Sequence, residues 1–169
     1  MASEKPRLIL RNATIFVDRN SRVGQAREVT LPTPEVAVEE FRNAGMVKAR
    51  DVNMGYSKLE ASFVETAFDP VVIGLFGLAP GVTKEFMATG ALVDEDGTVS
   101  NATAFMIGFL RQFDPGAWEP GSKAETTFNL SVHEFKLEVA GQTIIEMDDF
   151  DVKINGASQY QGIRSALLL

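Results

Sequence analysis

The sequence predicts a mainly β protein, an antiparallel β-sandwich or barrel that occupies residues 1–169 as a single domain. Three observations predict it. Turn signals such as Asp114-Pro115-Gly116 and Asn155-Gly156 recur at short intervals. The runs between them are rich in Val, Ile, Phe and Thr, which favour strands. Several runs alternate apolar and polar residues with the period of two of a half-buried strand.

Residues 40–57 break this pattern, because they carry mixed charge and show no sustained hydrophobic period. A loop of roughly 15 residues without structure of its own is unusual in a compact domain and is commonly functional. We therefore expect a long extended arm that finds its contacts on another molecule.

The next elements are a strand and one short flanking helix. In Lys58–Val64, the apolar residues Leu59, Ala61 and Phe63 alternate with Lys58, Glu60 and Ser62, which gives one apolar and one polar face. Asp69-Pro70 then supplies an N-cap and a proline at the first helical position. We expect a helix over Val71–Leu78, buried against a sheet because it is apolar nearly all round, and ended by Pro80-Gly81. A weaker helical turn is expected near Ser158–Ser165.

Asp96-Gly97 predicts a two-residue hairpin turn of the primed type, since both residues tolerate positive φ. The turn would join a strand near Glu85–Val93 to one near Thr98–Phe113. Within the second strand, Ala102–Leu110 does not alternate. We expect this stretch to be buried on both faces, or on one face by a neighbouring subunit.

The strand that follows changes phase in its middle. Apolar residues occupy the even positions Ala124, Phe128, Leu130 and Val132, and then the odd positions Phe135, Leu137 and Val139. A shift of one residue exchanges the two faces of a strand. We expect a β-bulge near His133, or a strand that leaves one sheet and continues in another.

Composition excludes several classes of site and partner. The chain has no cysteine and one histidine, so one copy cannot build a disulfide, a thiolate site or a multi-histidine metal site. Its longest apolar runs are shorter than the ~20 residues of a membrane helix, and residues 1–10 lack the apolar region of a signal peptide. We therefore expect a soluble protein made in the cytoplasm.

The formal charge is −7, and all of the excess lies in the second half. Residues 1–85 carry 11 basic and 11 acidic residues, whereas residues 86–169 carry 5 and 12. A protein that binds nucleic acid through phosphates should be basic or show a basic stripe, which this chain does not.

An enzyme is the weakest interpretation, and no catalytic residue, metal ligand or cofactor is expected. His133 lies in the middle of a strand, without the Gly-x-Ser-x-Gly turn of a serine hydrolase. The acidic run Asp148–Asp151 lacks the spacing of an EF-hand loop, so a solvated acidic loop is the simpler interpretation. Buried strands, a long arm and uneven charge point instead to assembly.

An ordered set of motifs resembles the major tail tube proteins of contractile phage tails and R-type tailocins. Val38–Met46 resembles the arm motif of that family, and Leu31-Pro32 precedes it. Asp114–Glu125 resembles the family's central loop and following strand. Phe135–Glu146 and Ile154–Leu169 resemble its last strands and C-terminal ending. Asp18-Arg19 and Leu168 depart from the usual pattern only near the ends.

The resemblance implies a structural protein of the virion tail or tailocin particle. In that family six copies form a ring with a shared lumen barrel, and rings stack into a tube inside a contractile sheath. The partners it implies are other copies of the chain, the sheath outside, a tape measure protein inside during assembly, and baseplate and tail terminator proteins at the ends. DNA would only pass through, without specific binding.

Two sets of residues follow from this resemblance as candidates. Polar strand positions could face the lumen, where acidic groups would repel passing DNA: Glu35, Glu39, Glu60, Glu125, Thr127, Asn129 and Ser131. Arm residues could contact a neighbouring subunit or the next ring: Phe41, Arg42, Asn43, Gly45, Met46, Val47 and Arg50.

Two alternatives stay open at this stage. A type VI secretion-like tube protein would share the architecture. A monomeric β-barrel that binds a small ligand would explain the apolar strands as a pocket lining, but would leave the arm unexplained.

Overall fold

Strands dominate the computed structural model, which describes residues 7–66 and 68–168. Residues 1–6 of the expected domain and Leu169 of the C-terminal motif lie outside the described residues. The elements, in chain order, are β1 (Ile9–Val17), β2 (Asn20–Ser21), β3 (Ala26–Thr30), β4 (Val36–Phe41), β5 (Arg50–Tyr56), β6 (Leu59–Glu65), α1 (Pro70–Ile73), β7 (Lys84–Val93), β8 (Val99–Asp114), β9 (Thr126–Val139), β10 (Gln142–Met147), β11 (Val152–Ile154), β12 (Ala157–Ser158) and α2 (Gln161–Ala166).

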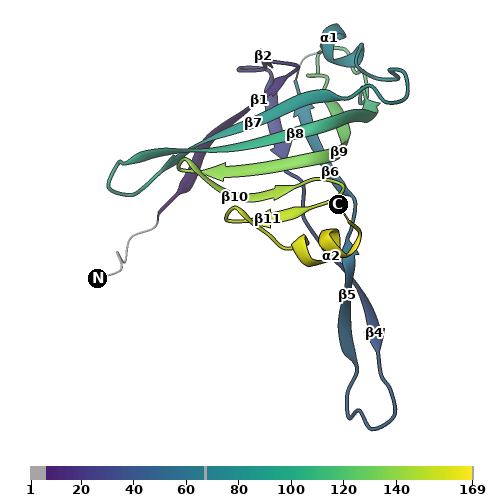
Figure 1. Cartoon of the computed structure of the whole chain (residues 1–169). Helices are drawn as coiled ribbons and strands as arrows, with labels where there is room; N and C mark the ends of the chain where they lie inside the picture. Colours follow the sequence, from purple (N-terminus) through teal and green to yellow (C-terminus); the bar gives the residue numbers. More distant parts are fainter. Residues whose placement is uncertain (1–6, 67, 169) are drawn as a thin grey trace.

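Ten strands form one antiparallel sheet, and β4 and β5 form a separate hairpin (Figure 1). The main path of the sheet runs β12-β11-β10-β9-β8-β7-β1-β2. β6 pairs with β9 off this path and carries β3 on its other edge. The predicted mainly β, antiparallel fold with short helices is confirmed.

The branch in the sheet arises in the middle of β9. β8 pairs with β9 over most of its length, but β6 pairs with residues 126–132 and β10 with residues 135–139 on the other edge. Ile107 pairs with Glu134 and Gly108 with Val132, so His133 is the extra residue of a bulge. The predicted phase slip is confirmed, and its cause is the bulge. The alternative, a strand that continues in a second sheet, is wrong, because β9 stays in one sheet and exchanges β6 for β10 on one edge.

The branch divides the sheet into two limbs. One limb contains β3, β6, the first half of β9 and the end of β8, and the other contains the remaining strands of the sheet. Both limbs share one hydrophobic core. The ring of Phe63 on β6 stacks on Phe128 of β9, with centroids 4.8 Å apart. The same ring lies 6.4 Å from Phe86 of β7, on the other limb. All three side chains are almost fully buried. The sheet therefore curls around its apolar face, as Figure 1 shows.

Helix α1 is shorter than predicted. Asp69 caps it as expected, since its Oδ1 accepts hydrogen bonds from the backbone N–H groups of Val71 and Val72 at 2.8 and 3.4 Å. The helix nevertheless ends at Ile73. The predicted range Val71–Leu78 is therefore wrong in length.

Two observations explain the early end of α1. Gly77 adopts a φ of +75°, which no α-helix accommodates. Phe76 forms a parallel bridge with Leu110 of β8 instead of a helical turn. The expectation of a helix buried all round is also wrong, because Val72 is fully buried but Val71 is 61% exposed.

The hairpin between β7 and β8 lies where the sequence predicts it, but its turn differs from the prediction. Val93 pairs with Val99, so the connection is longer than two residues. The N–H of Gly97 donates to the carbonyl of Asp94, and Gly97 has a φ of +88° whereas Asp96 does not have positive φ. This geometry is that of a type I turn followed by a left-handed glycine.

The run Ala102–Leu110 buries one face in the core and leaves the other face partly exposed. Ala104, Met106 and Leu110 enter the core, whereas Phe105 and Phe109 on the opposite face are 38% and 40% exposed. Burial on both faces within one chain is therefore ruled out. Cover from a neighbouring subunit remains a prediction.

The expected unstructured arm is a β-hairpin that begins earlier, at β4, and ends with β5 (Figure 1). Its strands pair from Val36 opposite Tyr56 to Phe41 opposite Arg50. It projects away from the sheet at the end opposite α1.

Helix α2 confirms the predicted C-terminal turn. Neither described helix has the length and apolar character that crossing a membrane requires.

Candidate functional site

A polar surface covers one limb of the sheet, where β3, β6, the first half of β9 and the end of β8 lie side by side. The register aligns Glu60 with Ser131, and Ser62 with Asn129. The outward residues, which we call the polar sheet face, are Glu28, Thr30, Glu60, Ser62, Val64, Phe109, Gln112, Asp114, Thr127, Asn129 and Ser131. This surface is the strongest candidate for a functional face.

The alternation of the strands builds this face, because the intervening residues point into the core. On β6, Leu59, Ala61 and Phe63 are buried, which sends Glu60 and Ser62 outward. On β9, Phe128 and Leu130 do the same for Thr127, Asn129 and Ser131. Burial of the apolar side therefore fixes the direction of the polar side.

The polar sheet face carries three carboxylates, Glu28, Glu60 and Asp114, and Glu60 is paired with two cations. Glu60 accepts from the Lys58 Nζ at 2.7 Å and from the Arg111 Nη1 at 2.9 Å. The hydrogen bond from Lys58 is the main cause of a lowered pKa for Glu60, so this carboxylate stays ionised. Nearby, the Asn129 amide donates to Gln112 at 3.5 Å. The result is a hydrophilic surface without a concentrated positive patch.

The structure brings together four of the seven predicted lumen residues: Glu60, Thr127, Asn129 and Ser131. Glu125 lies just before β9 and forms an ion pair with Arg27 of β3. Glu35 and Glu39 lie elsewhere, at the base of the arm and on β4. Thr30 and Gln112 of the face were not among the sequence candidates, because only the strand register aligns them with Ser62 and Asn129.

The limb that carries the polar sheet face has two open edges. β3 pairs with β6 alone among the described strands. The pairing of β7 with β8 stops at Lys84 opposite Gly108, and beyond it the described residues provide only the Phe76–Leu110 bridge. On the edge away from β9, residues 111–114 of β8 therefore have no strand partner among the described residues, just as β3 has none on the edge away from β6. Such edges readily pair with another chain.

The arm carries apolar side chains that the described part of the chain leaves largely exposed. Val38, Phe41, Met54 and Val47 are 56%, 42%, 60% and 94% exposed. An isolated two-stranded hairpin is marginally stable in water. We therefore expect contact with another molecule to cover these side chains and to stabilise the hairpin.

The tip of the arm is a tight turn in which glycine is required by backbone conformation. Gly45 has a φ of +87°, and a Cβ at this position would meet nothing within 4 Å. The Met46 N–H donates to the carbonyl of Asn43 at 3.1 Å, and the Asn43 N–H donates to the Met46 Sδ at 3.3 Å. Phe41 and Arg50 close the strands below the tip, while Arg42 and Val47 are exposed in it.

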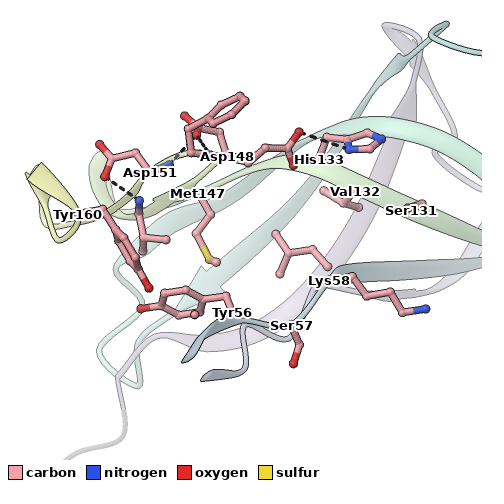
Figure 2. A pocket seen from close by; sticks show the side chains of 15 residues that line it. Tyr56, Ser57, Lys58, Ser131, Val132, His133, Met147, Asp148, Asp151 and Tyr160 are labelled. Atoms are coloured by element: carbon pink, nitrogen blue, oxygen red, sulfur yellow. Dashed lines mark hydrogen bonds and ion pairs between the residues drawn. The ribbon is translucent and has the colours of Figure 1, made fainter. Parts of the chain in front are cut away.

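A cavity of about 400 Å³ lies between the base of the arm and the C-terminal segment (Figure 2). Tyr56 and Lys58 line one side, and His133, Asp148 and Tyr160 line the other. The Asp148 Oδ1 accepts hydrogen bonds from the backbone N–H groups of Phe150 and Asp151 at 2.7 and 2.8 Å, so it stabilises its own loop. The His133 Nδ1 lies 3.8 Å from the Asp149 Oδ2.

The acidic loop that borders this cavity is structural. Asp151 accepts from Ser158 at 2.7 Å and from Arg164 of α2 at 3.3 Å. The Ser158 hydrogen bond is the first cause of a lowered pKa for Asp151. This residue is 4% exposed, so the expectation of a solvated loop is wrong for Asp151. Its role is to hold α2 against the end of the sheet.

Within residues 7–66 and 68–168, no three His, Asp or Glu side chains gather as a metal site would require.

Comparison with known proteins gives one consistent result. Residues 6–167 match the family described as phage tail tube protein FII. The chain is 25% identical over 158 residues to the tail tube protein of Escherichia phage P2, covering 90% of this chain and 92% of that protein. It is 26% identical over 155 residues to the major tail tube protein of Serratia phage KSP20, covering 89% and 90%.

The fold is also found in solved structures. A chain of the PVC sheath–tube complex, an extracellular contractile injection system in its extended state, superposes with a TM-score of 0.58 at 14% identity. That match covers 81% of this chain and 94% of the other. A chain from the sheath/tube terminator structure of the same system gives a TM-score of 0.60 at 13% identity, covering 81% and 99%.

Proposed function

This chain belongs to the phage tail tube protein FII family and is a tail tube subunit of a contractile phage tail or a related injection system, and from this premise we propose that six copies close into a ring through the edges of the limb that carries the polar sheet face. The observation that carries the proposal is that this limb is open at both edges, at β3 and at residues 111–114 of β8. The family is structural, so the chain is not an enzyme.

Direction and chemistry both favour such a closure. Each strand of the limb is antiparallel to the next, in the order β3-β6-β9-β8. The β8 of one copy and the β3 of the next would therefore meet in antiparallel orientation. Repetition of one edge-to-edge contact around an axis is a heterologous interface that closes into a ring. Closure removes every open edge of the barrel.

The polar sheet face would line the lumen of that ring. Its opposite side is the subunit core, so this face alone is available to the inside of a barrel built from these strands. Hydroxyl and amide groups from Thr127, Asn129 and Ser131 give a hydrophilic wall. The excess acidic charge of the chain would disfavour adhesion of DNA in transit.

The arm would join successive rings or neighbouring subunits. It projects from the end of the molecule opposite α1 and exposes Phe41 and Val47. Contact with another copy would cover these side chains and stabilise the hairpin. Outer partners are suggested by the matching structures, which come from sheath–tube and tube-terminator complexes. By the same reasoning we propose a sheath outside and a terminator at one end. Membership of the tail tube family is the ground on which we further propose a baseplate at the other end and a tape measure protein inside during assembly.

Electron microscopy of the purified chain, together with its mass in solution, tests the proposal. We expect rings or stacked tubes with a central hole and a mass of six 18.4 kDa chains per ring. A particle that stays monomeric at all concentrations, and is not recruited when preformed tubes are added as seeds, would overturn it. Seeding separates a subunit that needs a nucleus from one that does not assemble.

A further inference from the structure

A buried cluster of three charged side chains lies where β6 meets α1. Glu65, the last residue of β6, is fully buried. The Arg22 guanidinium lies between it and Asp69, with Nη1 2.7 Å from the Asp69 Oδ2 and Nε 3.9 Å from the Glu65 Oε1. Arg22 and Asp69 are each 8% exposed. Two carboxylates thus share one guanidinium away from water.

Glu65 is the member of the cluster that is poorly accommodated as an anion. Neither of its carboxylate oxygens has a hydrogen-bond partner in the described part of the chain. A buried carboxylate without donors is strongly disfavoured in its charged form. Burial, and then repulsion from Asp69, raise the pKa of Glu65 to about 7, although Arg22 opposes the shift.

The cluster joins three separate parts of the fold. Arg22 belongs to the connection between β2 and β3, and its N–H donates to the carbonyl of Ile15 on β1. Glu65 pairs with Thr126 of β9 and with Ala26 of β3. Asp69 caps α1 through hydrogen bonds to the first helical N–H groups. A change in the sharing of Arg22 between the two carboxylates therefore acts on the attachment of α1.

We propose that Arg22, Glu65 and Asp69 form a proton-operated latch, which holds α1 firmly to the sheet when Glu65 is protonated and loosens it when Glu65 is ionised. In the protonated state Arg22 pairs with Asp69 alone. In the ionised state Glu65 competes with Asp69 for the same guanidinium, which weakens the tie that positions the helix cap. This inference is independent of ring formation.

The surroundings of Glu65 leave few other groups that titrate against it. Arg22 and Asp69 are the charged groups that act on it in the described chain, and Thr126 on β9 presents only a hydroxyl. Arg27 and Glu125, the next residues along β3 and before β9, neutralise each other in an exposed ion pair. Protonation of Glu65 is therefore the event that changes the net charge of the cluster.

The direction of the pH effect follows from linkage. The folded chain binds the Glu65 proton more tightly than the unfolded chain, whose glutamate keeps its ordinary value of 4.5. Stability from this group is therefore complete below pH 4.5, falls as the pH rises towards 7, and does not change further above it. Between pH 5.5 and 8.5 the unfolding constant should rise roughly tenfold to thirtyfold from this group alone.

The first experiment compares urea unfolding of the wild type, Glu65→Gln and Glu60→Gln at pH 5.5 and 8.5. Glu60 is an exposed carboxylate on the same strand and serves as the matched control. We expect the rise in the unfolding constant in the wild type and in Glu60→Gln, and its loss in Glu65→Gln. The single histidine is present in all three, so the difference between variants isolates Glu65. An unchanged pH dependence in Glu65→Gln would overturn the proposal.

A second readout follows the latch itself. Trp118 is the only tryptophan, and its ring lies 5.5 Å from Phe68, next to Asp69. Its fluorescence should change with pH around 7 in the wild type, because ionised Glu65 loosens the connection between β6 and α1, which carries Phe68. In Asp69→Asn the transition should move to lower pH, since the repulsion from Asp69 is removed while an asparagine can still cap the helix. A transition that stays in place in Asp69→Asn, or no transition in the wild type, contradicts the latch even if Glu65→Gln fails to fold.

Discussion

The backbone of Ser131 lies so close to Gly108 that a Cβ on residue 108 would sit 2.9 Å from the Ser131 carbonyl carbon and overlap its oxygen. This contact lies beside the bulge at His133, where β9 leaves β6 and takes β10 as its partner. Gly108 does not have positive φ, so space rather than backbone conformation requires glycine here. The close approach is how β8 follows the bend of its neighbour.

Replacement of Gly108 by alanine should therefore destabilise the subunit. The added methyl group has to displace backbone, which costs about 1–3 kcal/mol or more in a packed strand. Urea unfolding of Gly108→Ala measures the loss. Gly162→Ala in α2 is the matched control, because a Cβ there meets nothing within 4 Å. Equal stability of the two variants would show that the sheet can relax at the bulge without cost.

Most of the sheet could be predicted from the sequence, because burial imposes a period of two on Leu59–Val64 and on β9. The bulge at His133 was predicted for the same reason. The arm could not be predicted as a hairpin, since both of its faces are exposed and burial imposes no alternation on it. The end of α1 depended on Phe76 bridging to Leu110, a long-range contact that local signals do not carry.

The candidate site shows the same division. Alternation alone placed Thr127, Asn129 and Ser131 on one face, but the register across β3 and β8 was needed to add Thr30 and Gln112. The charged cluster left a sequence signal that was missed. Glu65 stands at a position of β6 where the alternation requires a buried residue, and a buried glutamate needs a partner.

Cysteines on the two open edges should link neighbouring copies. The chain has no cysteine of its own, so Thr30→Cys with Gln112→Cys gives one reactive site on β3 and one on β8. Within a copy these strands are three spacings apart, roughly 14 Å, which a thiol linker of about 8 Å does not bridge. Treatment of the assembled double variant with this thiol linker should give a ladder of cross-linked chains on denaturing gels, and the ladder should end at six chains.

Two controls define that experiment. Each single-cysteine variant should give no product beyond a dimer, since a ladder needs both edges. Cross-linking of dilute, unassembled protein should give none. Assembled tubes of the double variant that yield only monomers would refute edge-to-edge closure between β3 and β8.

A charge at the tip of the arm should block stacking without harming the subunit. Val47 is 94% exposed, so Val47→Asp removes no internal contact and should leave the unfolding midpoint unchanged. Burial of the new carboxylate against another copy would be unfavourable, so tubes should be short or absent in electron micrographs. Val47→Ser is the neutral control and should form longer tubes than the aspartate variant. Long tubes of Val47→Asp would mean that the tip stays in solvent after assembly.

Positive charges placed on the polar sheet face should change how DNA passes through the lumen. Thr127→Lys with Asn129→Lys adds two cations per copy on the outward side of β9, where no core contact is lost. If these residues line the lumen, each ring gains a band of positive charge that attracts DNA phosphates. We expect tubes to form, but short duplex DNA to be retained by them at low salt and released as salt is raised, whereas wild-type tubes retain none. Thr89→Lys on β7 lies outside this limb and should behave like the wild type. Retention by Thr89→Lys and not by the double variant would place the lumen on the other limb of the sheet.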